Sequence, residues 1–239
     1  MGSVIEFNPD YRIEVRKLAG GSALVIVDDV LRDREQLVRL AQEQFPQIPP
    51  GGRWHYPGIE VQLAEDFAEP CARFFRRHVR EYFDLSRLVR EAYARLSMVT
   101  VAPEQLTWMQ RMCHVDISST TPGECVIASV LYLFEDCELG GTAFFTQRPE
   151  VTPYLELLEQ GNPGPRSAEF EFFQQAPVYH TGSNEFFQLD QVAEARSNRM
   201  IFYRGNVHHS AHIIAPQLLS EDPAKGRLTL NGFYRVATR

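Results

Sequence analysis

The chain has 239 residues, enough for one large domain with a substantial buried core, and we expect a single domain over residues 1–239. Its 24 basic and 31 acidic residues leave a net charge of −7, which disfavours a generic binder of phosphate backbones, so we expect no nucleic-acid partner. The opening residues, MGSVIEFNPDYRIEV, lack the pattern of a secretion signal, and no run is long enough to cross a bilayer. We therefore expect a cytoplasmic protein without a membrane partner.

The first part of the chain, residues 1–97, is expected to form a region of strands and helices that supports the remainder. Residues 22–31 predict a strand that stops at a pair of aspartates, and residues 45–58 have the proline and glycine content of a loop. The apolar spacing elsewhere in this part is helical, and residue 70 is a proline suited to a first helical turn. The expected helices cover residues 32–45, 69–83 and 86–96.

From about residue 97 the apolar residues stop recurring at helical spacing and begin to alternate or to form short β-branched and aromatic blocks. Strands that follow helices indicate a mainly β fold with flanking helices (α+β). We expect a double-stranded β-helix, a jelly-roll or cupin-like core, over residues 98–239, with the N-terminal helices packed outside it. The less regular residues 147–196 are expected to form a lid-like insertion. The expected strands are residues 97–101, 107–116, 125–134, 141–145, 198–205 and 226–236.

The four cysteines form neither a metal-binding pattern nor a disulfide framework. They include no CxxC pair and no tight cluster. We therefore expect reduced and mostly buried thiols at Cys71, Cys113, Cys125 and Cys137.

A histidine and an aspartate stand one residue apart in MCHVDISS, residues 112–119. Because side chains alternate along a strand, His114 and Asp116 are expected on one face, where an imidazole nitrogen and a carboxylate oxygen can converge on one ion. The same pattern also occurs as an ordinary hydrogen-bonded pair at a strand end. The motif alone therefore does not decide between a metal site and a structural pair.

A third metal ligand has to come from another segment of the chain. His208, His209 and His212 follow the strand expected over residues 198–205. Two histidines and one carboxylate on one side of a metal leave positions open for a cosubstrate and dioxygen, which suits non-haem Fe(II). Zinc prefers a fuller shell of protein ligands.

The last expected strand carries an arginine and two other polar residues at alternate positions. Arg227, Thr229 and Asn231 share one face, and Leu228 and Leu230 occupy the other. A guanidinium that points into a barrel needs an anionic partner, and its fork of donors suits a carboxylate. The alternative is that Arg227 starts a strand after a turn and points to solvent.

The ordered motifs His114-x-Asp116, VLYLFEDCELGGTAFF, GNVHHSAH and GRLTLNGFY resemble the iron(II)- and 2-oxoglutarate-dependent dioxygenase superfamily, close to its prolyl-hydroxylase-like branch. That branch combines an HxD motif, a strand pair with a glycine turn, a distal histidine and a basic residue on the next strand. The segments VIVDDVL, YPG, HHSA and GRLTLNGF further resemble a bacterial group of the superfamily. The similarity covers roughly residues 107–146 and 198–236, and more loosely residues 23–58.

The resemblance implies a metal-binding role for three residues. His114 and Asp116 are then the first two Fe(II) ligands. His209 is the third, because the superfamily places this histidine just before a small residue, here Ser210, and His208 remains the alternative.

The resemblance also implies which residues bind the cosubstrate. Arg227 then pairs with the remote carboxylate of 2-oxoglutarate, Thr229 assists it, and Tyr132 also reaches that carboxylate. Two features depart from the family pattern: the connection from His209 to Arg227 is longer than in prolyl hydroxylases, and Glu135-Asp136 replaces the usual asparagine. Neither departure affects the metal ligands directly.

The activity implied is hydroxylation of an unactivated C–H bond in an amino acid or a small natural-product intermediate, using Fe(II), 2-oxoglutarate and dioxygen (O2) and releasing succinate and CO2. Asp116 leaves no vacancy for chloride, so hydroxylation, desaturation or ring closure is favoured over halogenation. The alternatives are a hydroxylase of peptide-bound or carrier-bound residues, a non-catalytic jelly-roll protein that binds a ligand or metal, and a cupin-like zinc or nickel hydrolase or isomerase. The oligomeric state is not predicted.

The sequence does not identify the substrate. Arg111 and Arg204 are candidates to bind a substrate carboxylate, against the plainer interpretation that they are surface or structural arginines. Aromatic and histidine side chains in two loops are candidates to line the mouth of a site, or simply to anchor those loops. They are Trp54, His55, Tyr56, Tyr179, His180, Phe186 and Phe187.

Overall fold

The computed structural model describes residues 5–48, 56–107, 109–116, 121–151 and 176–239. Over these residues no helix is both long and apolar enough to cross a membrane. The α-helices are α1 (Glu35–Gln44) and α2 (Glu65–Phe74). Shorter helical segments are η1 (Phe45–Gln47), the π-helix η2 (Phe75–Val79), η3 (Arg80–Phe83), η4 (Pro103–Gln105), η5 (Met109–Arg111), η6 (Cys137–Leu139), η7 (Pro149–Val151) and η8 (Pro216–Leu218). The strands are β1 (Arg12–Lys17), β2 (Ala23–Asp28), β3 (Gly58–Gln62), β4 (Leu85–Val99), β5 (Glu124–Tyr132), β6 (Thr142–Gln147), β7 (Phe187–Ala193), β8 (Met200–Arg204), β9 (His208–Ala211) and β10 (Arg227–Thr238).

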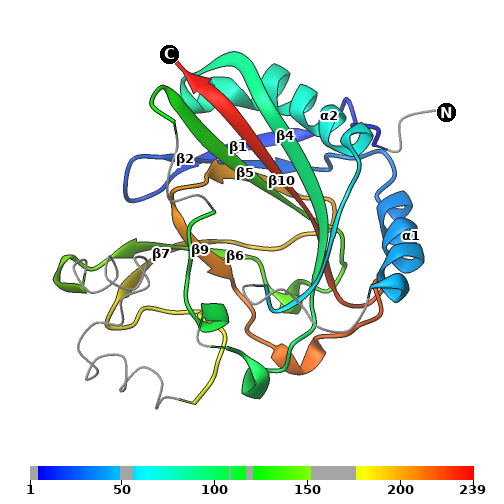
Figure 1. The fold of residues 1–239 in the computed structure, drawn as a ribbon, viewed down its shortest axis with the longest axis vertical. Coiled ribbons are helices and arrows are strands. Elements are labelled where there is room, and N and C mark those ends of the chain that lie inside the picture. The colour runs from blue at the N-terminus through cyan, green and yellow to red at the C-terminus, as the bar shows by residue number, and fades with distance from the viewer. Residues whose placement is uncertain (1–4, 49–55, 108, 117–120, 152–175) are drawn as a thin grey trace.

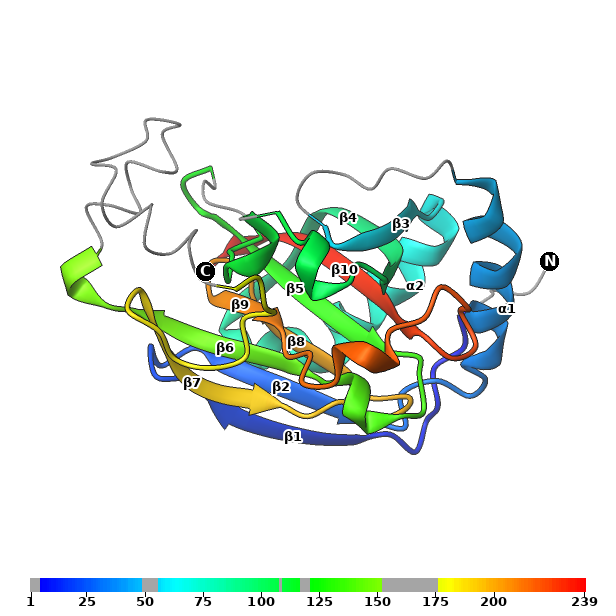
Figure 2. The same cartoon turned by 90° about the horizontal axis from the view of Figure 1, so that it is seen from below.

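The strands form two antiparallel sheets. The large sheet has seven strands in the order β1-β2-β8-β5-β10-β4-β3, and the small sheet has three in the order β7-β6-β9. Figures 1 and 2 show α1 and α2 on one side of the large sheet, with β6, β7 and β9 on the other. The protein is therefore mainly β, with two α-helices among the residues described.

Side-chain alternation explains why both faces of the large sheet are buried. On β5, Ile127 and Leu131 pack in the cluster that contains the apolar faces of α1 and α2. Ala128 and Tyr132 point the other way and pack with Phe144 of the small sheet. Strands covered on both faces carry apolar residues at successive positions, as this strand does.

Most of the expected strands and the first helix are confirmed. Strands β2, β5, β6, β8 and β10 fall within or overlap the expected ranges, and α1 lies within residues 32–45. The second helix begins at Glu65, earlier than expected, so Pro70 lies inside α2 and not in its first turn. All four cysteines are free: Cys71 and Cys113 are buried, Cys125 is half-buried and Cys137 is exposed.

The expected helix over residues 86–96 is wrong, because this segment belongs to the long strand β4. β4 pairs with β10 along most of its length and with β3 over its C-terminal residues 95–99. Its arginines, glutamate and alanines favour a helix in isolation, but pairing with two neighbouring strands overrides that weak preference. The boundary expected at residue 97 falls within β4.

The expected strand over residues 107–116 is also wrong for most of its length. Met109–Arg111 form a short 3₁₀ helix, and of the residues described in this segment only His114 makes a β-bridge, to His209. Conversely, β7 lies within residues 147–196, where no strand was expected. The remainder of the expected lid-like insertion includes residues 152–175, which are outside the described part of the chain.

A largely buried ion pair joins the end of β2 to the start of β8. Arg199 donates from Nε to Asp28 Oδ1 at 2.6 Å and from Nη2 to Asp28 Oδ2 at 3.0 Å. The two side chains are only 13% and 18% exposed. The hydrogen bond from Arg199 lowers the pKa of Asp28 below its ordinary value.

We expect Asp28→Asn to lower the free energy of unfolding at pH 7 by roughly 2 kcal/mol, because it leaves the Arg199 guanidinium without its carboxylate. Since the folded-state pKa of Asp28 is lowered, this stabilisation is present above the unfolded pKa and is lost as the pH falls below about 4. Denaturant titrations between pH 7 and pH 3 measure both effects. Lys225→Met, which breaks an exposed ion pair with Asp222, is the control and should change stability little. A difference between wild type and Asp28→Asn that does not shrink at low pH would contradict the assignment.

Candidate metal centre

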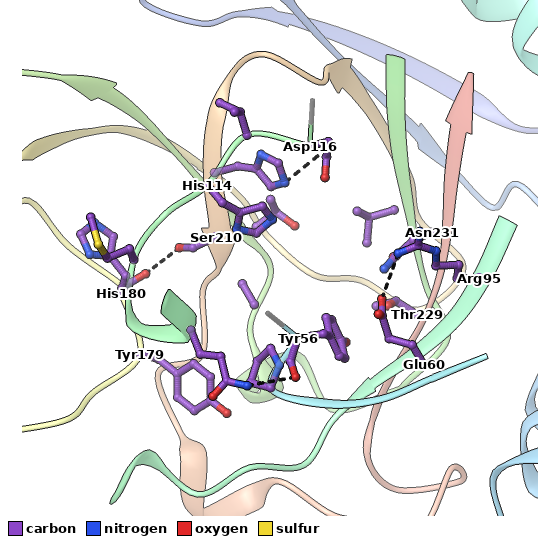
Figure 3. Close-up of a pocket in the computed structure, with 18 of the residues that line it drawn as sticks. Tyr56, Glu60, Arg95, His114, Asp116, Tyr179, His180, Ser210, Thr229 and Asn231 are labelled. Atoms are coloured by element: carbon purple, nitrogen blue, oxygen red, sulfur yellow. Dashed lines mark hydrogen bonds and ion pairs between the residues drawn. The ribbon is translucent and has the colours of Figure 1, made fainter. Parts of the chain in front are cut away.

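Two histidines and one aspartate converge between the sheets. One ligand atom each from His114, Asp116 and His209 lies within 4.8 Å of the others. Figure 3 shows His114 and Asp116 at one side of a cavity of about 410 Å³ that His209 also lines. The grouping provides two imidazole nitrogens and a carboxylate oxygen, the ligand set of a metal site with open positions.

Backbone pairing brings these three residues together. His114 and His209 exchange N–H to carbonyl hydrogen bonds of 2.9 Å in both directions, and Asp116 N–H donates to Gly205 O at 2.8 Å. The segment around His114 thus runs beside β9 as a short extension of the small sheet. Although the segment is not a regular strand, His114 and Asp116 still reach one site.

The protonation states of the site suit a cation. His209 Nδ1 lies 2.9 Å from Val207 O, so Nδ1 carries the proton and Nε2 presents its lone pair. Burial lowers the pKa of His209 to about 4, so the ring is neutral at pH 7 and its 3.6 Å approach to Asp116 is not an ion pair. Burial also raises the pKa of Asp116 to about 6.

The Asp116 carboxylate is a buried acceptor in need of a partner. Its Oδ2 atom is inaccessible and has no hydrogen-bond partner among the residues described. A buried, unpaired carboxylate oxygen is costly, and a bound cation would compensate it. The donor set and this unpaired oxygen therefore fit a divalent metal ion.

His208, the alternative ligand, points away from His114 and Asp116. It lines a second cavity together with Leu18 and Arg204, and its ring lies 5.1 Å from that of Phe187. This follows from alternation along β9, which sends adjacent side chains to opposite faces. His212 is likewise not part of the group of converging ligands.

Arg227 lines the same cavity as the metal-ligand group, and it is 4% exposed, so the solvent-facing alternative is wrong. Its Nε donates to Leu139 O at 3.1 Å and Gly140 O at 3.2 Å, and its Nη2 donates to Gly141 O at 2.6 Å. Desolvation by burial lowers the pKa of Arg227. No carboxylate lies within ion-pair distance of it over the described residues, so this buried cation is held by carbonyl dipoles and by the ring of Phe134, whose centroid is 5.8 Å from the guanidinium carbon.

The glycine turn allows these carbonyl groups to approach Arg227. Gly140 has a φ of +80°, and a Cβ there would lie 1.7 Å from His212 O. A Cβ on Gly141 would lie 1.9 Å from Ala193 O. Neither position accepts a side chain without moving the backbone.

Thr229 and Tyr132 occupy different places relative to the cavity. Thr229 lines it, and its hydroxyl donates to Ser97 O at 3.2 Å. Tyr132 is fully buried behind the wall, with its hydroxyl 2.9 Å from Thr142 Oγ1, and Thr142 is the residue that reaches the cavity.

Three of the other residues predicted to contact a substrate line the cavity, and the rest of those described do not. Tyr56, Tyr179 and His180 line the cavity, whereas Trp54 and His55 are outside the described residues. Phe186 and Phe187 pack in a separate apolar cluster. Arg111 is buried but does not line the cavity, and Arg204 lines the second cavity and donates to Phe83 O at 2.7 Å.

Two charged residues in the cavity wall were missed by the sequence analysis. Glu60 on β3 and Arg95 on β4 both line it. Arg95 was placed on a helix, so its alternation with Leu96 and Ser97 was not interpreted as a strand. Recognising period-two spacing from Tyr93 onwards would have located it.

Fold and site together define a two-sheet β protein with a group of two histidines and one carboxylate facing a buried arginine. The chain belongs to the family of unknown function DUF6445, which matches residues 9–234. No curated protein matched the sequence.

Several solved structures show a distant likeness to the chain. A prolyl-4-hydroxylase from Pseudomonas putida is 12% identical with a TM-score of 0.42, over 86% of this chain and 85% of the other. HygX from Streptomyces hygroscopicus, with nickel and 2-oxoglutarate bound, is 10% identical with a TM-score of 0.45, over 90% and 82%. SnoN, a non-heme alpha ketoglutarate dependent epimerase from nogalamycin biosynthesis, is 15% identical with a TM-score of 0.46, over 90% and 80%.

We expect His209→Ala to raise the dissociation constant for Fe(II) roughly a hundredfold or more, because it removes a ligand. His208→Ala is the matched control, since it deletes the adjacent imidazole on the opposite face, and it should leave metal binding nearly unchanged. Anaerobic titration with Fe(II) measures both variants. The reverse result would move the third ligand to His208.

Proposed function

We propose that the protein is a non-haem Fe(II)- and 2-oxoglutarate-dependent oxygenase of the prolyl-hydroxylase-like branch. It would hydroxylate an unactivated C–H bond of an amino acid or a small natural-product intermediate, with formation of succinate and CO2. One observation carries the proposal: Arg227, a buried cation without an ion-pair partner among the residues described, shares one cavity with His114, Asp116 and His209. A dicarboxylate that chelates a metal at one end and pairs with an arginine at the other fits both features.

The arrangement of strands supports a double-stranded β-helix. Strands β4, β10, β5 and β8 are consecutive in the large sheet and face the small sheet across the apolar cluster and the cavity. Closed packing of two antiparallel sheets around a site is the architecture of jelly-roll and cupin-like proteins. The added strands β1 and β2 extend the large sheet at one edge, and β3 extends it at the other.

His114, Asp116 and His209 would hold Fe(II), and Arg227 would hold the far carboxylate of 2-oxoglutarate. When bound, the metal and cosubstrate supply the activation of O2 and the oxidising power that side chains lack. The Val207 carbonyl holds the proton of His209 on Nδ1, so Nε2 is kept free for the metal. Thr229 lies two residues from Arg227 on the same wall, and its hydroxyl, which donates to Ser97 O, would turn to donate to the carboxylate instead.

Two tyrosines of the cavity lining, Tyr56 and Tyr179, would flank the cosubstrate beside Arg227. Burial lowers the pKa of Arg227, and the nearby Tyr56 and Tyr179 act in the opposite direction. The Tyr179 hydroxyl donates to Val101 O at 2.6 Å. Exclusion of water strengthens the pairing of a guanidinium with a carboxylate. Asp116 fills the ligand position that a halide would otherwise take, so oxygen transfer is favoured over halogenation.

The proposal predicts a visible metal-to-ligand charge-transfer band when Fe(II) and 2-oxoglutarate are added together without oxygen. Arg227→Met should weaken 2-oxoglutarate binding roughly a hundredfold, about 3 kcal/mol, because the carboxylate then lacks its cation. Asp116→Ala should lose Fe(II) binding and with it the band. Spectrophotometric titration under anaerobic conditions measures both.

Arg80→Met is the control for loss of a half-buried arginine. Arg80 lies outside the cavity lining and donates to Leu85 O at 3.2 Å, so this variant should leave the band unchanged. A non-catalytic protein would give no band and no succinate under air. A zinc or nickel hydrolase or isomerase would bind metal but be indifferent to 2-oxoglutarate. Either outcome in the wild type would overturn the proposed function.

A further inference from the structure

The cavity wall opposite the metal-ligand group carries a second set of polar side chains. On β10 and β4, Thr229 pairs with Ser97 and Asn231 pairs with Arg95, and on β3 Glu60 pairs with Ser97. Directly opposed residues of an antiparallel ladder project from the same face. Figure 3 shows Glu60, Arg95 and Asn231 together on this wall, facing His114 and Asp116 across the cavity.

Of this set, Glu60, Arg95 and Asn231 are not among the residues assigned to the metal and the cosubstrate. Asn231 is four residues beyond Arg227 on β10, about 13 Å along the strand. Glu60, Arg95 and Asn231 nevertheless line the same cavity as His114, Asp116 and His209, so the set faces the metal-ligand group (Figure 3). A ligand held here would lie beside the reacting centre without displacing the cosubstrate.

A chain of hydrogen bonds fixes the orientation of the Asn231 amide. Asn231 Nδ2 donates to Ser97 Oγ at 3.1 Å, and Ser97 Oγ donates to Glu60 Oε1 at 3.3 Å. Because the Glu60 carboxylate only accepts, the serine proton goes to Glu60, and the amide must present its NH2 group to Ser97. Asn231 Oδ1 is left buried without a hydrogen-bond partner among the described residues.

Arg95 is held in place yet keeps an unused donor. Its guanidinium lies over the rings of Tyr93 and Phe233, 5.1 Å and 5.5 Å from their centroids. Its Nη1 is 3.7 Å from Glu60 Oε1, and its Nε is buried with no hydrogen-bond partner over the described residues. Two aromatic faces pre-orient the planar cation, so little freedom is lost when it binds an anion.

The charges on this wall differ from those around Arg227. Over the described part of the chain no carboxylate lies within ion-pair distance of Arg227, so a ligand that balances it must bring a negative charge. Glu60 and Arg95 already balance each other, so a ligand here that satisfies both must bring one positive and one negative group. The unpaired Asn231 Oδ1 adds an acceptor beside Glu60, and the unpaired Arg95 Nε adds a donor.

We propose that Glu60 and Asn231 bind the ammonium group, and Arg95 the carboxylate, of a free α-amino acid substrate. The inference rests on the proposed function and narrows it to free amino acids. An ammonium donates to two acceptors here, and a carboxylate accepts from the guanidinium. Within a peptide the α-amino and α-carboxyl groups are uncharged amides, so they make only the weaker neutral hydrogen bonds with Glu60, Asn231 and Arg95 and leave both side-chain charges without a charged partner from the ligand.

The test uses the full chain loaded anaerobically with Fe(II) and 2-oxoglutarate. Each of the twenty standard L-amino acids is titrated by calorimetry, and those that bind are compared with their N-acetyl and C-terminal amide derivatives. We expect at least one free amino acid to bind, and both derivatives to bind at least roughly tenfold more weakly. No binding of any free amino acid, or equal binding of a blocked derivative, would overturn the proposal.

Variants assign each charge to its residue. In Glu60→Gln, N-acetylation should no longer weaken binding, whereas amidation still should. In Arg95→Met, amidation should no longer weaken binding, whereas N-acetylation still should. Arg235→Met and Glu91→Gln are matched controls, because that ion pair lies further along the same two strands and outside the cavity lining. If N-acetylation and amidation weaken binding to these two variants as much as to the wild type, the assignment of the charges to Glu60 and Arg95 is contradicted.

The charge-transfer band separates this inference from the proposed function. The band should persist in Glu60→Gln and Arg95→Met, which also shows that both variants are folded. A band without amino-acid binding would overturn the inference alone. Absence of the band in the wild type would overturn the proposed function itself.

Discussion

The side-chain alternation of β10 is the constraint on which the site depends. β10 is paired on both sides, to β4 and to β5, so its register is fixed by two ladders of backbone hydrogen bonds. Leu228 and Leu230 pack in the core under the helices, which leaves Arg227, Thr229 and Asn231 facing the cavity. A slip of one residue would expose the leucines to the cavity and place a guanidinium in the core. Core packing therefore holds the polar residues of the site in position.

The small sheet supplies the opposite wall by the same means. The reciprocal backbone bonds between His114 and His209 bring two imidazoles from distant parts of the chain together, and the bond from Asp116 to Gly205 adds the carboxylate. The site therefore needs no regular strand around His114. Its ligand geometry comes from backbone pairing, and Asp116 Oδ2 is buried without a hydrogen-bond partner among the residues described.

The sequence was most informative where both faces of a strand are buried or where polar and apolar residues alternate strictly. Such patterns located β5 and β10, and they allowed the face of Arg227 to be predicted. β4 was not predictable in this way, because its outer half is partly exposed and rich in helix-forming residues, and its partner β10 lies far downstream. Because residues 86–96 were expected to form a helix, Arg95 was not predicted to line the cavity, and neither was its ion pair with Glu60. Strand β7 was hidden for a related reason, since its middle residues are only half-buried and largely polar.

Four charged side chains line the cavity, and they differ in whether the protein itself balances their charge. Asp116 has a buried oxygen without a hydrogen-bond partner and Arg227 has no ion-pair partner among the residues described, so each requires a ligand of opposite charge. Glu60 and Arg95 are within 3.7 Å of each other and balance each other before any ligand arrives. Unbalanced buried charges gain most from ligands of opposite charge, so metal and dicarboxylate would bind more strongly than the substrate. The proposed substrate, which has no net charge, would then bind and leave while the metal and cosubstrate remain, because its departure would restore an ion pair that the protein already contains.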